Sequence, residues 1–240
     1  MTSEALLPDA LLAVMEATWP AASVQQVGPW LIRDGQGGGK RVSAATALPG
    51  WHPDDIAQAE AAMAALNQPA LFLIRGGEEA LDTALAARGY HIVDPVVAYA
   101  APVAALAQMP DHMATFPHWP PMAIAADLWA EGGIGPARLA VMQRAAEPKT
   151  VILGRAGDRA SGAAFVAIHQ GTAMLHALEV TPAQRRQGSA HNILRAAAVW
   201  AQENGAETLS LVVTTANAAA RRLYASFGMQ VVGNYHYRQK

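Results

Sequence analysis

The order of apolar and polar residues along the chain predicts two successive runs of short strands and helices. In the first run, strands are expected at 28–35, 41–48, 69–77 and 90–100, and helices at 1–20, 51–67 and 78–89. In the second run, strands are expected at 149–157, 162–171, 172–180 and 208–215, and helices at 136–146, 191–205 and after 216. The short turns between 149 and 180 favour an antiparallel meander, so we expect an α/β (α+β) protein with helices flanking its sheets.

The ends of the two runs share one plan, in which a helix, a short apolar strand, an alanine-rich helix and a glycine precede a final strand. Aligning Gly89 with Gly228 places ALDTALAARGYHIVDPVVAYA over AAARRLYASFGMQVVGNYHYR. This similarity predicts two tandem copies of one fold, although two alanine-rich helices can also look alike by chance. The segment around MPDHMATFPHWPP is rich in proline and lacks periodicity. We therefore expect a first module at 1–105, a linker at 106–121 and a second module at 122–240.

Composition narrows the classes of partner and cofactor. A net charge of -2 and a pI near 6.4 argue against nucleic acid, and no apolar run reaches the ~18 residues that cross a membrane. The chain has no cysteine, and its eight histidines show no HExxH spacing, so neither a thiolate nucleophile nor a metal site is expected. The acidic N-terminus lacks the basic region of a secretory signal. These features favour a cytoplasmic monomer or homodimer.

The segment from Thr181 to Gly205 places small residues where a strand turns into a helix. Apolar residues at helical spacing mark one face of 191–205, and Gly205 ends the helix. At its start, Gly188 and Ala190 allow several backbone N–H groups to point at one anion, with attraction from the helix dipole. This predicts a pyrophosphate site. The geometry leaves the ligand open, although the absence of GK[ST] and GxGxxG argues against a nucleoside triphosphate and a dinucleotide.

Two motifs around this helix resemble those of the GNAT superfamily of N-acetyltransferases. The order V-x-P-x-x-R-R-x-G-x-A at 180–190 resembles the family's R/Q-x-x-G-x-G/A acyl-CoA loop. The segment 217–229, which follows the strand TLSLVVTT, resembles N-x-x-A-x-x-L-Y-x-x-x-G-F, with Met229 in place of the usual aromatic residue. The two motifs occur in the family's order and together cover about half of the chain.

The resemblance implies an enzyme that transfers an acetyl group from acetyl-CoA, without a metal, to a primary amine of a small molecule or peptide. It implies that backbone amides at 187–190 hold the pyrophosphate and that the backbone at 178–180 pairs with the pantetheine arm. The residues that it assigns to the cofactor are Leu178, Val180, Arg185, Arg186, Gln187, Gly188, Ser189, Ala190 and Asn217.

Three residues are candidates for the chemistry of direct attack. The resemblance implies that Tyr224 is the general acid that protonates the departing thiolate, whereas periodicity alone favours a core tyrosine. His176 is the first candidate for the base, acting through water, because it titrates near neutral pH; a hydrogen bond within the sheet is its alternative role. Glu179 is the second candidate. Strand alternation points His176 and Glu179 to opposite faces unless a bulge, such as the family's kink in this strand, intervenes.

The first run lacks these motifs. Leu85 stands where Tyr224 stands in the second run, Glu78 stands where Asn217 does, and no RxxGxA precedes the helix at 51–67. The first run therefore resembles the degenerate module of tandem GNAT proteins, which would close one side of the acceptor site.

Two other functions stay open at this point. One is a non-catalytic module that binds or senses acyl-CoA, and the other is an interaction protein whose N-terminal half is the working surface. The acceptor amine is not predicted, because acceptor pockets are built from variable loops and early helices, here 109–146. Within that segment, Phe116, Trp119 and Trp129 would either line an apolar pocket or fill a core.

Overall fold

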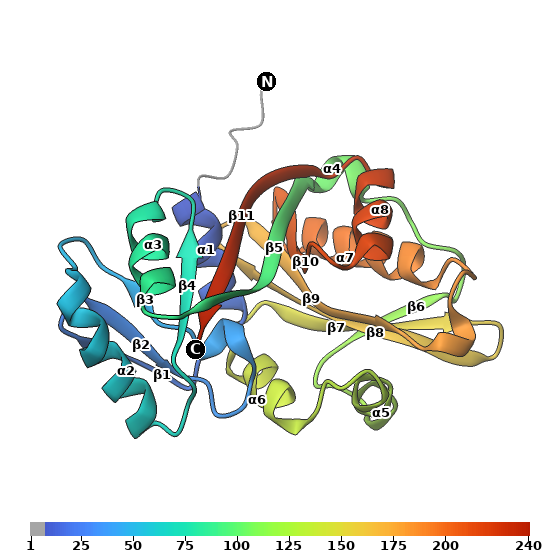
Figure 1. Cartoon of the computed structure of the whole chain (residues 1–240). Helices are drawn as coiled ribbons and strands as arrows, with labels where there is room; N and C mark the ends of the chain where they lie inside the picture. The colour runs from blue at the N-terminus through green and yellow to red at the C-terminus, as the bar shows by residue number, and fades with distance from the viewer. Residues whose placement is uncertain (1–7) are drawn as a thin grey trace.

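The computed structural model describes residues 8–240, with side chains from Ala10 onward, and one eight-stranded sheet runs through most of it (Figure 1). The strand order is β4-β11-β5-β10-β9-β8-β7-β6, and all neighbours are antiparallel except β9 and β10. The strands are β4 (Leu71–Arg75), β5 (His91–Pro102), β6 (Thr115–His118), β7 (Lys149–Ala156), β8 (Arg159–His169), β9 (Thr172–Val180), β10 (Thr208–Thr214) and β11 (Gln230–Gln239). The prediction of a mixed, mostly antiparallel sheet flanked by helices is confirmed.

A second, three-stranded antiparallel sheet lies at the N-terminal end of the fold. It consists of β1 (Ser23–Val27), β2 (Trp30–Asp34) and β3 (Thr46–Ala47). A single parallel bridge between Ala45 and Phe72 connects it to β4 of the large sheet. The two sheets are therefore continuous through this one contact.

Helices cover both faces of the large sheet. They are α1 (Pro8–Thr18), α2 (Ile56–Ala65), α3 (Glu79–Ala87), α4 (Val103–Leu106), α5 (Ala123–Glu131), α6 (Pro136–Arg144), α7 (Ser189–Glu203) and α8 (Ala218–Ser226). On β9, Leu175 belongs to the core beneath α7, whereas Met174 belongs to the core beneath α1. Because neighbouring strand residues point to opposite faces, α7 and α1 lie on opposite sides of the sheet. Residues 1–7 of the predicted N-terminal helix lie outside the described residues.

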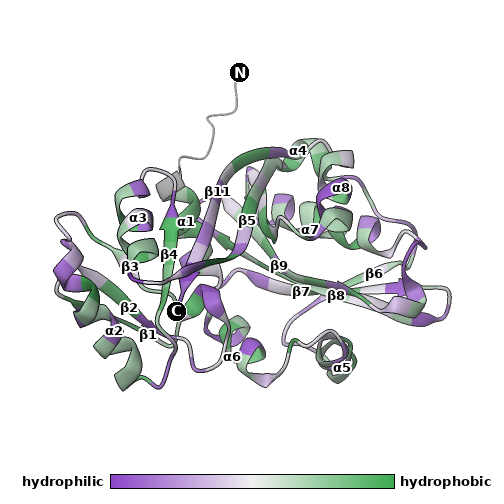
Figure 2. Ribbon diagram, in the orientation of Figure 1, coloured by the Kyte–Doolittle hydropathy of each residue, from purple (hydrophilic) through white to green (hydrophobic). Residues whose placement is uncertain are grey.

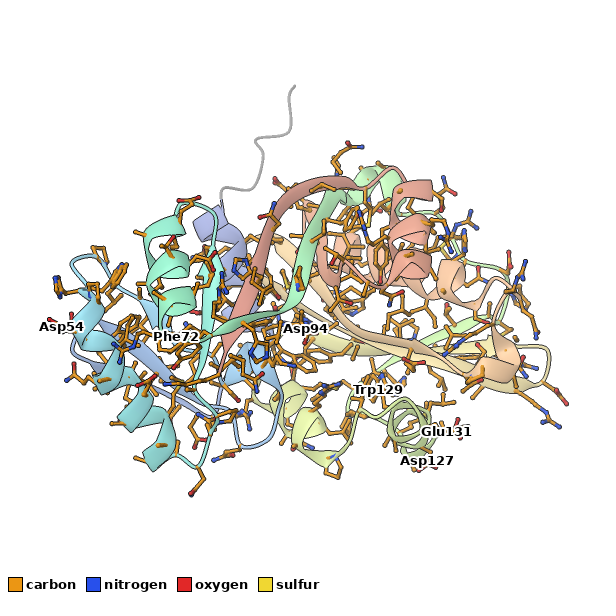
Figure 3. The ribbon with its side chains drawn as sticks, in the orientation of Figure 1. Asp54, Phe72, Asp94, Asp127, Trp129 and Glu131 are labelled. Carbon is orange, nitrogen blue, oxygen red and sulfur yellow. The ribbon has the colours of Figure 1, made fainter. Side chains whose placement is uncertain are left out.

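Helix α5 illustrates why these segments pack as they do. Trp129 is fully buried and its Nε1 donates a 2.8 Å hydrogen bond to the carbonyl of Ala177, which ties the helix to β9. Asp127 and Glu131 lie on the outer side of the same helix, away from the sheet (Figure 3). The helix therefore has one apolar face that the sheet covers and one charged face in solvent.

Hydrophobic residues concentrate on the strands and on the helix faces that meet them, as Figure 2 shows along β4 and β9. Phe116, Trp119 and Trp129, which the sequence left between a pocket and a core, all pack in the core beneath α5. The aromatic residues of 109–146 thus stabilise the sheet. They do not line the cavity beside β9 and β10, which is described below.

Three local predictions are wrong. Residues 41–48, expected to form one strand, contain part of a 3₁₀ turn (Lys40–Val42) and the two-residue strand β3. Strand β1 was not expected at all, because SVQQV is largely polar and exposed at the edge of its sheet. Residues Thr115–His118, inside the expected linker 106–121, form β6 and pair with β7. The proline in β6 is tolerated because β6 is an edge strand.

The two halves of the chain interleave at the centre of the large sheet. Strand β5, from the first half, lies between β10 and β11, and β11 in turn lies between β5 and β4. Figure 1 shows β5 and β11 side by side along their whole lengths. The last strand of each half therefore completes hydrogen bonding for strands of the other half.

Candidate active site

An opening separates the ends of β9 and β10. The two strands pair in parallel from Thr172–Thr208 to Leu175–Leu211, and no pairs follow. The cause lies in β9, where Ala177 adopts φ 51° and the register with β8 shifts between Ala163 and Phe165. Such a bulge bends its strand. The backbone of 176–180 consequently faces the opening with its hydrogen-bonding groups unpaired toward β10.

The bulge also decides where the side chains of β9 point. Leu178 and Val180 pack against the core beneath α7, whereas Ala177 packs against the core beneath α5. Glu179 lies next to Gly132 at the end of α5, on the same side as His176, which bonds to Thr18 of α1. The extra residue therefore brings His176 and Glu179 to one face, as the sequence expected if a bulge intervened.

The loop after β9 leads directly into α7. Gly188 is the N-cap of α7 with φ 81°, and the first helical hydrogen bond runs from the Asn192 N–H to the Gly188 carbonyl. A Cβ at Gly188 would meet no atom within 4 Å, so this glycine serves the left-handed backbone rather than a close contact. The N–H groups that precede Asn192 make no hydrogen bond within the helix and lie at its positive end.

Side chains of the same loop add to this anion-binding character. Ser189 is buried, and its hydroxyl has no hydrogen-bond partner among residues 8–240. Arg185 is tied to the end of β9, because its Nε donates to the Val180 carbonyl at 3.1 Å and its Nη2 lies 3.3 Å from a Glu179 oxygen. Arg186, Gln187 and Gly188 are exposed, and Arg186 has φ 62°. Arg185 therefore holds the loop against β9, while residues 186–188 before α7 stay exposed.

The two residues of the second motif have different positions. The Asn217 side chain caps α8 by accepting a 3.0 Å hydrogen bond from the Ala220 N–H. Tyr224 lies on the inner face of α8, 5 % exposed, with its ring 5.8 Å from that of Tyr99. Burial raises the pKa of Tyr224 to about 12, so its hydroxyl keeps its proton at neutral pH. Tyr224 is thus part of the core beneath α7, lies on the helix that Asn217 caps, and keeps its hydroxyl proton.

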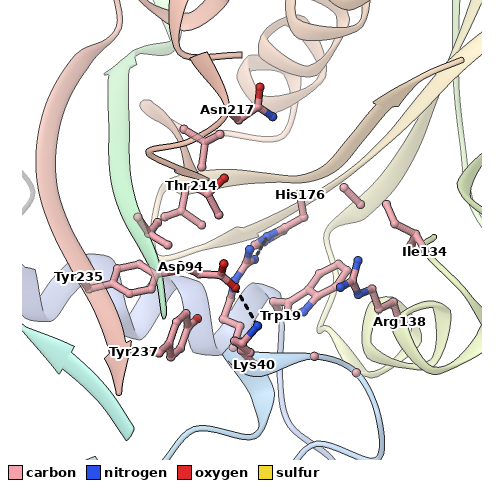
Figure 4. Close-up of a pocket in the computed structure, with 17 residues that line it drawn as sticks. Trp19, Lys40, Asp94, Ile134, Arg138, His176, Thr214, Asn217, Tyr235 and Tyr237 are labelled. Carbon is pink, nitrogen blue, oxygen red and sulfur yellow. Dashed lines mark hydrogen bonds and ion pairs between the residues drawn. The ribbon is translucent and has the colours of Figure 1, made fainter. Parts of the chain in front are cut away.

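A cavity of about 340 Å³ opens beside the ends of β9 and β10 (Figure 4). Its floor includes His176 and Ala177 of β9, and 212–214 of β10 with Asn217 form another wall. The remaining lining residues are Trp19, Gly38, Gly39, Lys40, Arg41, Asp94, Val96, Ile134, Arg138, Tyr235 and Tyr237. The structure therefore brings His176 and Asn217 to one cavity, whereas Tyr224 and Glu179 are not among its lining residues.

Sequence reasoning missed most of this lining. From 109–146, where the acceptor pocket was expected, Ile134 and Arg138 line the cavity, and the first half of the chain supplies Trp19, 38–41 and Asp94. One signal was present in the sequence, since an Asp-Pro pair interrupts the otherwise apolar strand β5. Asp94 indeed has φ 43° there, which places its carboxylate at the cavity instead of in the strand ladder.

His176 is held by hydrogen bonds on both ring nitrogens. Arg41 donates to Nδ1 at 2.8 Å, and Nε2 lies 2.9 Å from the Thr18 hydroxyl, which donates to the Val14 carbonyl at 2.7 Å. Since arginine can only donate, Nδ1 accepts and Nε2 carries the hydrogen. Burial and the Arg41 charge hold the pKa of His176 well below its ordinary value of 6.5. The ring is therefore neutral at physiological pH, with its one lone pair occupied by Arg41.

Within residues 8–240, no group of three His, Asp or Glu side chains is arranged to hold a metal ion. No helix in the same part of the chain combines the length and the apolar character that a membrane crossing requires.

Comparison with known proteins finds a family model that matches the part of the chain that carries this geometry. Residues 117–229 match the model of the acetyltransferase (GNAT) family, a range that contains β9, the opening, α7 and α8. The match supports membership of the GNAT superfamily of N-acetyltransferases. The "Uncharacterized N-acetyltransferase YobR" of Bacillus subtilis is 26% identical over 234 residues, which cover 93% of this chain and 95% of YobR. The family of acetyl-transferring enzymes is thus supported for the second half, and the likeness to YobR extends over both halves.

Solved structures with the GNAT fold superpose on most or all of the chain. A "GCN5-related N-acetyltransferase from Kribbella flavida" has a TM-score of 0.72 at 17% identity and covers 100% of this chain and 96% of its own. A "Tandem GNAT protein from the clavulanic acid biosynthesis pathway" has a TM-score of 0.60 at 14% identity, covering 82% of this chain and 74% of its own. At these identities the likeness establishes the GNAT fold.

Proposed function

We propose that the chain transfers an acetyl group from acetyl-CoA to the primary amine of a small molecule or peptide by direct attack. The observation that carries this proposal is the opening between β9 and β10, which has an anion-ready helix start at one end and a cavity at the other. A cosubstrate with a pyrophosphate and a long thioester arm matches these two features. Acetyl-CoA has both.

The residues present fit such a cosubstrate. The N–H groups of 187–190 and the unpartnered Ser189 hydroxyl would donate to the pyrophosphate. The unpaired backbone edge at Leu178 and Val180 would pair with the amides of the pantetheine arm as a neighbouring strand does. Asn217 would contact the arm with its amide nitrogen, because its side-chain oxygen already caps α8. Arg185 and Arg186 would contribute positive charge around this loop.

The chemistry needs one proton donor and one proton acceptor. The amine nitrogen attacks the thioester carbonyl carbon, the C–S bond breaks, and Tyr224 gives its hydroxyl proton to the departing thiolate. The high pKa of Tyr224 supports this role, because the proton is still present when the thiolate forms. The proton lost by the amine passes through water to a base. His176 can accept it once Arg41 releases Nδ1, and Glu179 is the second candidate on the same face.

We also propose that the two halves are tandem GNAT-like modules, 1–105 and 122–240. Each half has an antiparallel three-stranded meander, a helix, a strand, a helix and a final strand, in that order. The shift that carries Gly89 onto Gly228 also carries Glu79–Ala87 (α3) onto Ala218–Ser226 (α8). If the two alanine-rich helices were similar only by chance, the first and last residues of α3 would not be expected to match those of α8 under the same shift.

Strand pairing supports the same repeat. Two residue pairs exchange places under the shift: Arg75–Tyr235 in β4–β11 and Thr214–Val96 in β10–β5. The register of the exchanged strands therefore agrees between the two halves. Such agreement is expected when two copies of one module swap their last strands around a local twofold axis.

The first module lacks the features that the chemistry needs. The segment before α2 carries Asp54 and Asp55, and His52 and Asp55 form a capping box that occupies its N–H groups. Glu78, at the position of Asn217, pairs with Arg75. Leu85, at the position of Tyr224, is fully buried and has no proton to give. We propose that this module binds no acetyl-CoA and closes one side of the acceptor cavity.

A coenzyme A release assay tests the proposed activity. Acetyl-CoA is incubated with the full chain and a panel of amino acids, polyamines, arylalkylamines, aminoglycosides and peptides, and free thiol is measured. We expect release with at least one amine. Acetyl-CoA binding without release would favour the sensing module. No affinity for acetyl-CoA, together with a stable protein partner, would favour the interaction protein.

A further inference from the structure

Three cationic side chains and one carboxylate line the cavity beside His176. Lys40 and Asp94 neutralise each other, because the Lys40 Nζ lies 2.8 Å from an Asp94 oxygen. Arg41 and Arg138 have no carboxylate partner within the described part of the chain. The cavity therefore has an excess of two positive charges. A ligand that brings negative charge would compensate this excess.

Arg41 is held in place by uncharged groups. Its Nη1 donates to the neutral His176 ring at 2.8 Å, and its guanidinium carbon lies 5.6 Å from the centre of the Trp19 ring. His176 is in turn fixed by Thr18, so a chain of hydrogen bonds from α1 sets the position of the guanidinium. A half-buried charge without a counterion is unfavourable, and an anion that reaches it gains a strong charge-assisted hydrogen bond.

Arg138 approaches the cavity from α6, on the other side of the 38–41 loop (Figure 4). Its Nε and Nη2 lie 3.6 Å from the point that a Cβ of Gly39 would occupy. Gly39 has φ 99°, a conformation that other residues rarely adopt. A Cβ at this position would make only ordinary van der Waals contact with Arg138, so the loop needs glycine for its backbone conformation.

From these contacts we propose that the acceptor is an amine that also carries an anionic group, a carboxylate or a phosphate, which Arg41 and Arg138 bind. This inference rests on the proposed acetyltransferase function and names the substrate class of the same site. The planar fork of arginine matches both anions with two parallel hydrogen bonds. Amino acids have the required pair of groups, whereas polyamines and aminoglycosides would add positive charge to a cavity that already has an excess.

Matched acceptor pairs test the anion directly. Each amino acid is compared with its amide and with the amine that lacks the carboxyl group, and phosphoethanolamine is compared with ethanolamine. We expect at least a ~10-fold higher kcat/KM for the anionic member, which is the effect of one charge-assisted hydrogen bond. Preference for free amino acids over phosphoethanolamine identifies a carboxylate site, and the reverse identifies a phosphate site. Equal or better use of the neutral or cationic members would overturn the proposal.

Arg138→Gln links the preference to the cavity, and Arg159→Gln, at the exposed first residue of β8, is the matched control. We expect Arg138→Gln to lower the ratio of acid to amide without abolishing it, because Arg41 remains, while the KM for acetyl-CoA stays unchanged. The control should keep the wild-type ratio. An unchanged ratio in Arg138→Gln would contradict a role for this guanidinium.

A binding measurement separates failure of this inference from failure of the proposed function. The coenzyme A complex of the full chain is titrated calorimetrically with N-acetyl amino acids and with their amides, so no turnover is needed. Tighter binding of the acids would support the anion site even if no amine released coenzyme A. The absence of release would then refute only the enzymatic function. Equal binding of acids and amides would refute the anion site alone.

Discussion

Tyr224 lies on α8, the helix after β10, and burial raises its pKa to about 12, so it keeps the proton that the proposed general acid would give. Tyr224→Phe removes the proton donor but keeps the ring that packs near Tyr99. We expect turnover to fall ~10² to 10⁴-fold with acetyl-CoA affinity nearly intact, because acid catalysis acts on the transition state. Tyr99→Phe, a buried neighbour, is the control in the same steady-state assay. An unchanged rate for a slow amine would mean that the thiolate leaves unassisted.

His176 makes a prediction about stability against pH. Its pKa is lower in the folded chain than in the unfolded chain, so the unfolded state binds the proton first as the pH falls. The stability that neutral His176 contributes is therefore complete above about pH 6.5 and is lost as the pH drops toward the folded value. We expect the melting temperature to fall less between pH 7.5 and 5.5 in His176→Gln than in the wild type. The exposed His52→Gln should follow the wild type. Equal losses in all three proteins would refute this account.

The sequence identified candidate site residues more readily than it identified the side chains that contact them. The second motif singled out Tyr224, and the strand before the first motif supplied His176 as a candidate base. Strand alternation with one bulge gave the orientation of Glu179. The partner of His176 could not be predicted, because Arg41 is separated from it by most of the chain and is brought near by the packing of the two halves. The same holds for Asp94 and Arg138, whose positions at the cavity depend on tertiary contacts that local pattern does not encode.

At the level of elements, the start of α7 carries the proposed pyrophosphate site. Gly188→Glu places a carboxylate at the start of α7, beside the N–H groups proposed to hold the pyrophosphate, so we expect acetyl-CoA binding to be lost through charge repulsion. Gly188→Ala has the same left-handed backbone strain, ~1 to 2 kcal/mol, without the charge. It should retain binding, as calorimetry with acetyl-CoA can measure. Wild-type affinity in folded Gly188→Glu would refute this position for the pyrophosphate.

Most of the helices and strands could be predicted from the sequence. The long amphipathic helix α7 and the meander of β7, β8 and β9 follow from strong periodicity and short turns, and both are confirmed. Strands β1 and β6 were not predicted because both are short edge strands. Strand β1 is polar and β6 contains a proline, so each depends on pairing with its neighbour for its extended conformation. The place of β5 between β10 and β11 is a long-range pairing, which apolar patterning alone leaves undetermined.

For the whole molecule, the interleaved strands explain how the first half could be required even if, as proposed, it binds no cosubstrate. Strand β5 contributes hydrogen bonds to β10, one wall of the opening, and to β11. The first half also supplies Trp19, Arg41 and Asp94 to the cavity. If only the second module binds the cosubstrate, calorimetry should find one acetyl-CoA per chain. Two per chain would overturn the silent first module.

Deletion of residues 1–105 tests the supporting role. Without β4 and β5, strand β11 loses both of its neighbours and β10 keeps only its short pairing with β9, so apolar strand edges are exposed. We expect the fragment 106–240 to be insoluble or weakly active. Co-expression of 1–105 as a separate chain should restore solubility and coenzyme A release, because the same strands can pair between two chains. A fully active fragment alone would show that the first half is dispensable, and failure of the pair to assemble would show that covalent connection is needed for the strands to interleave.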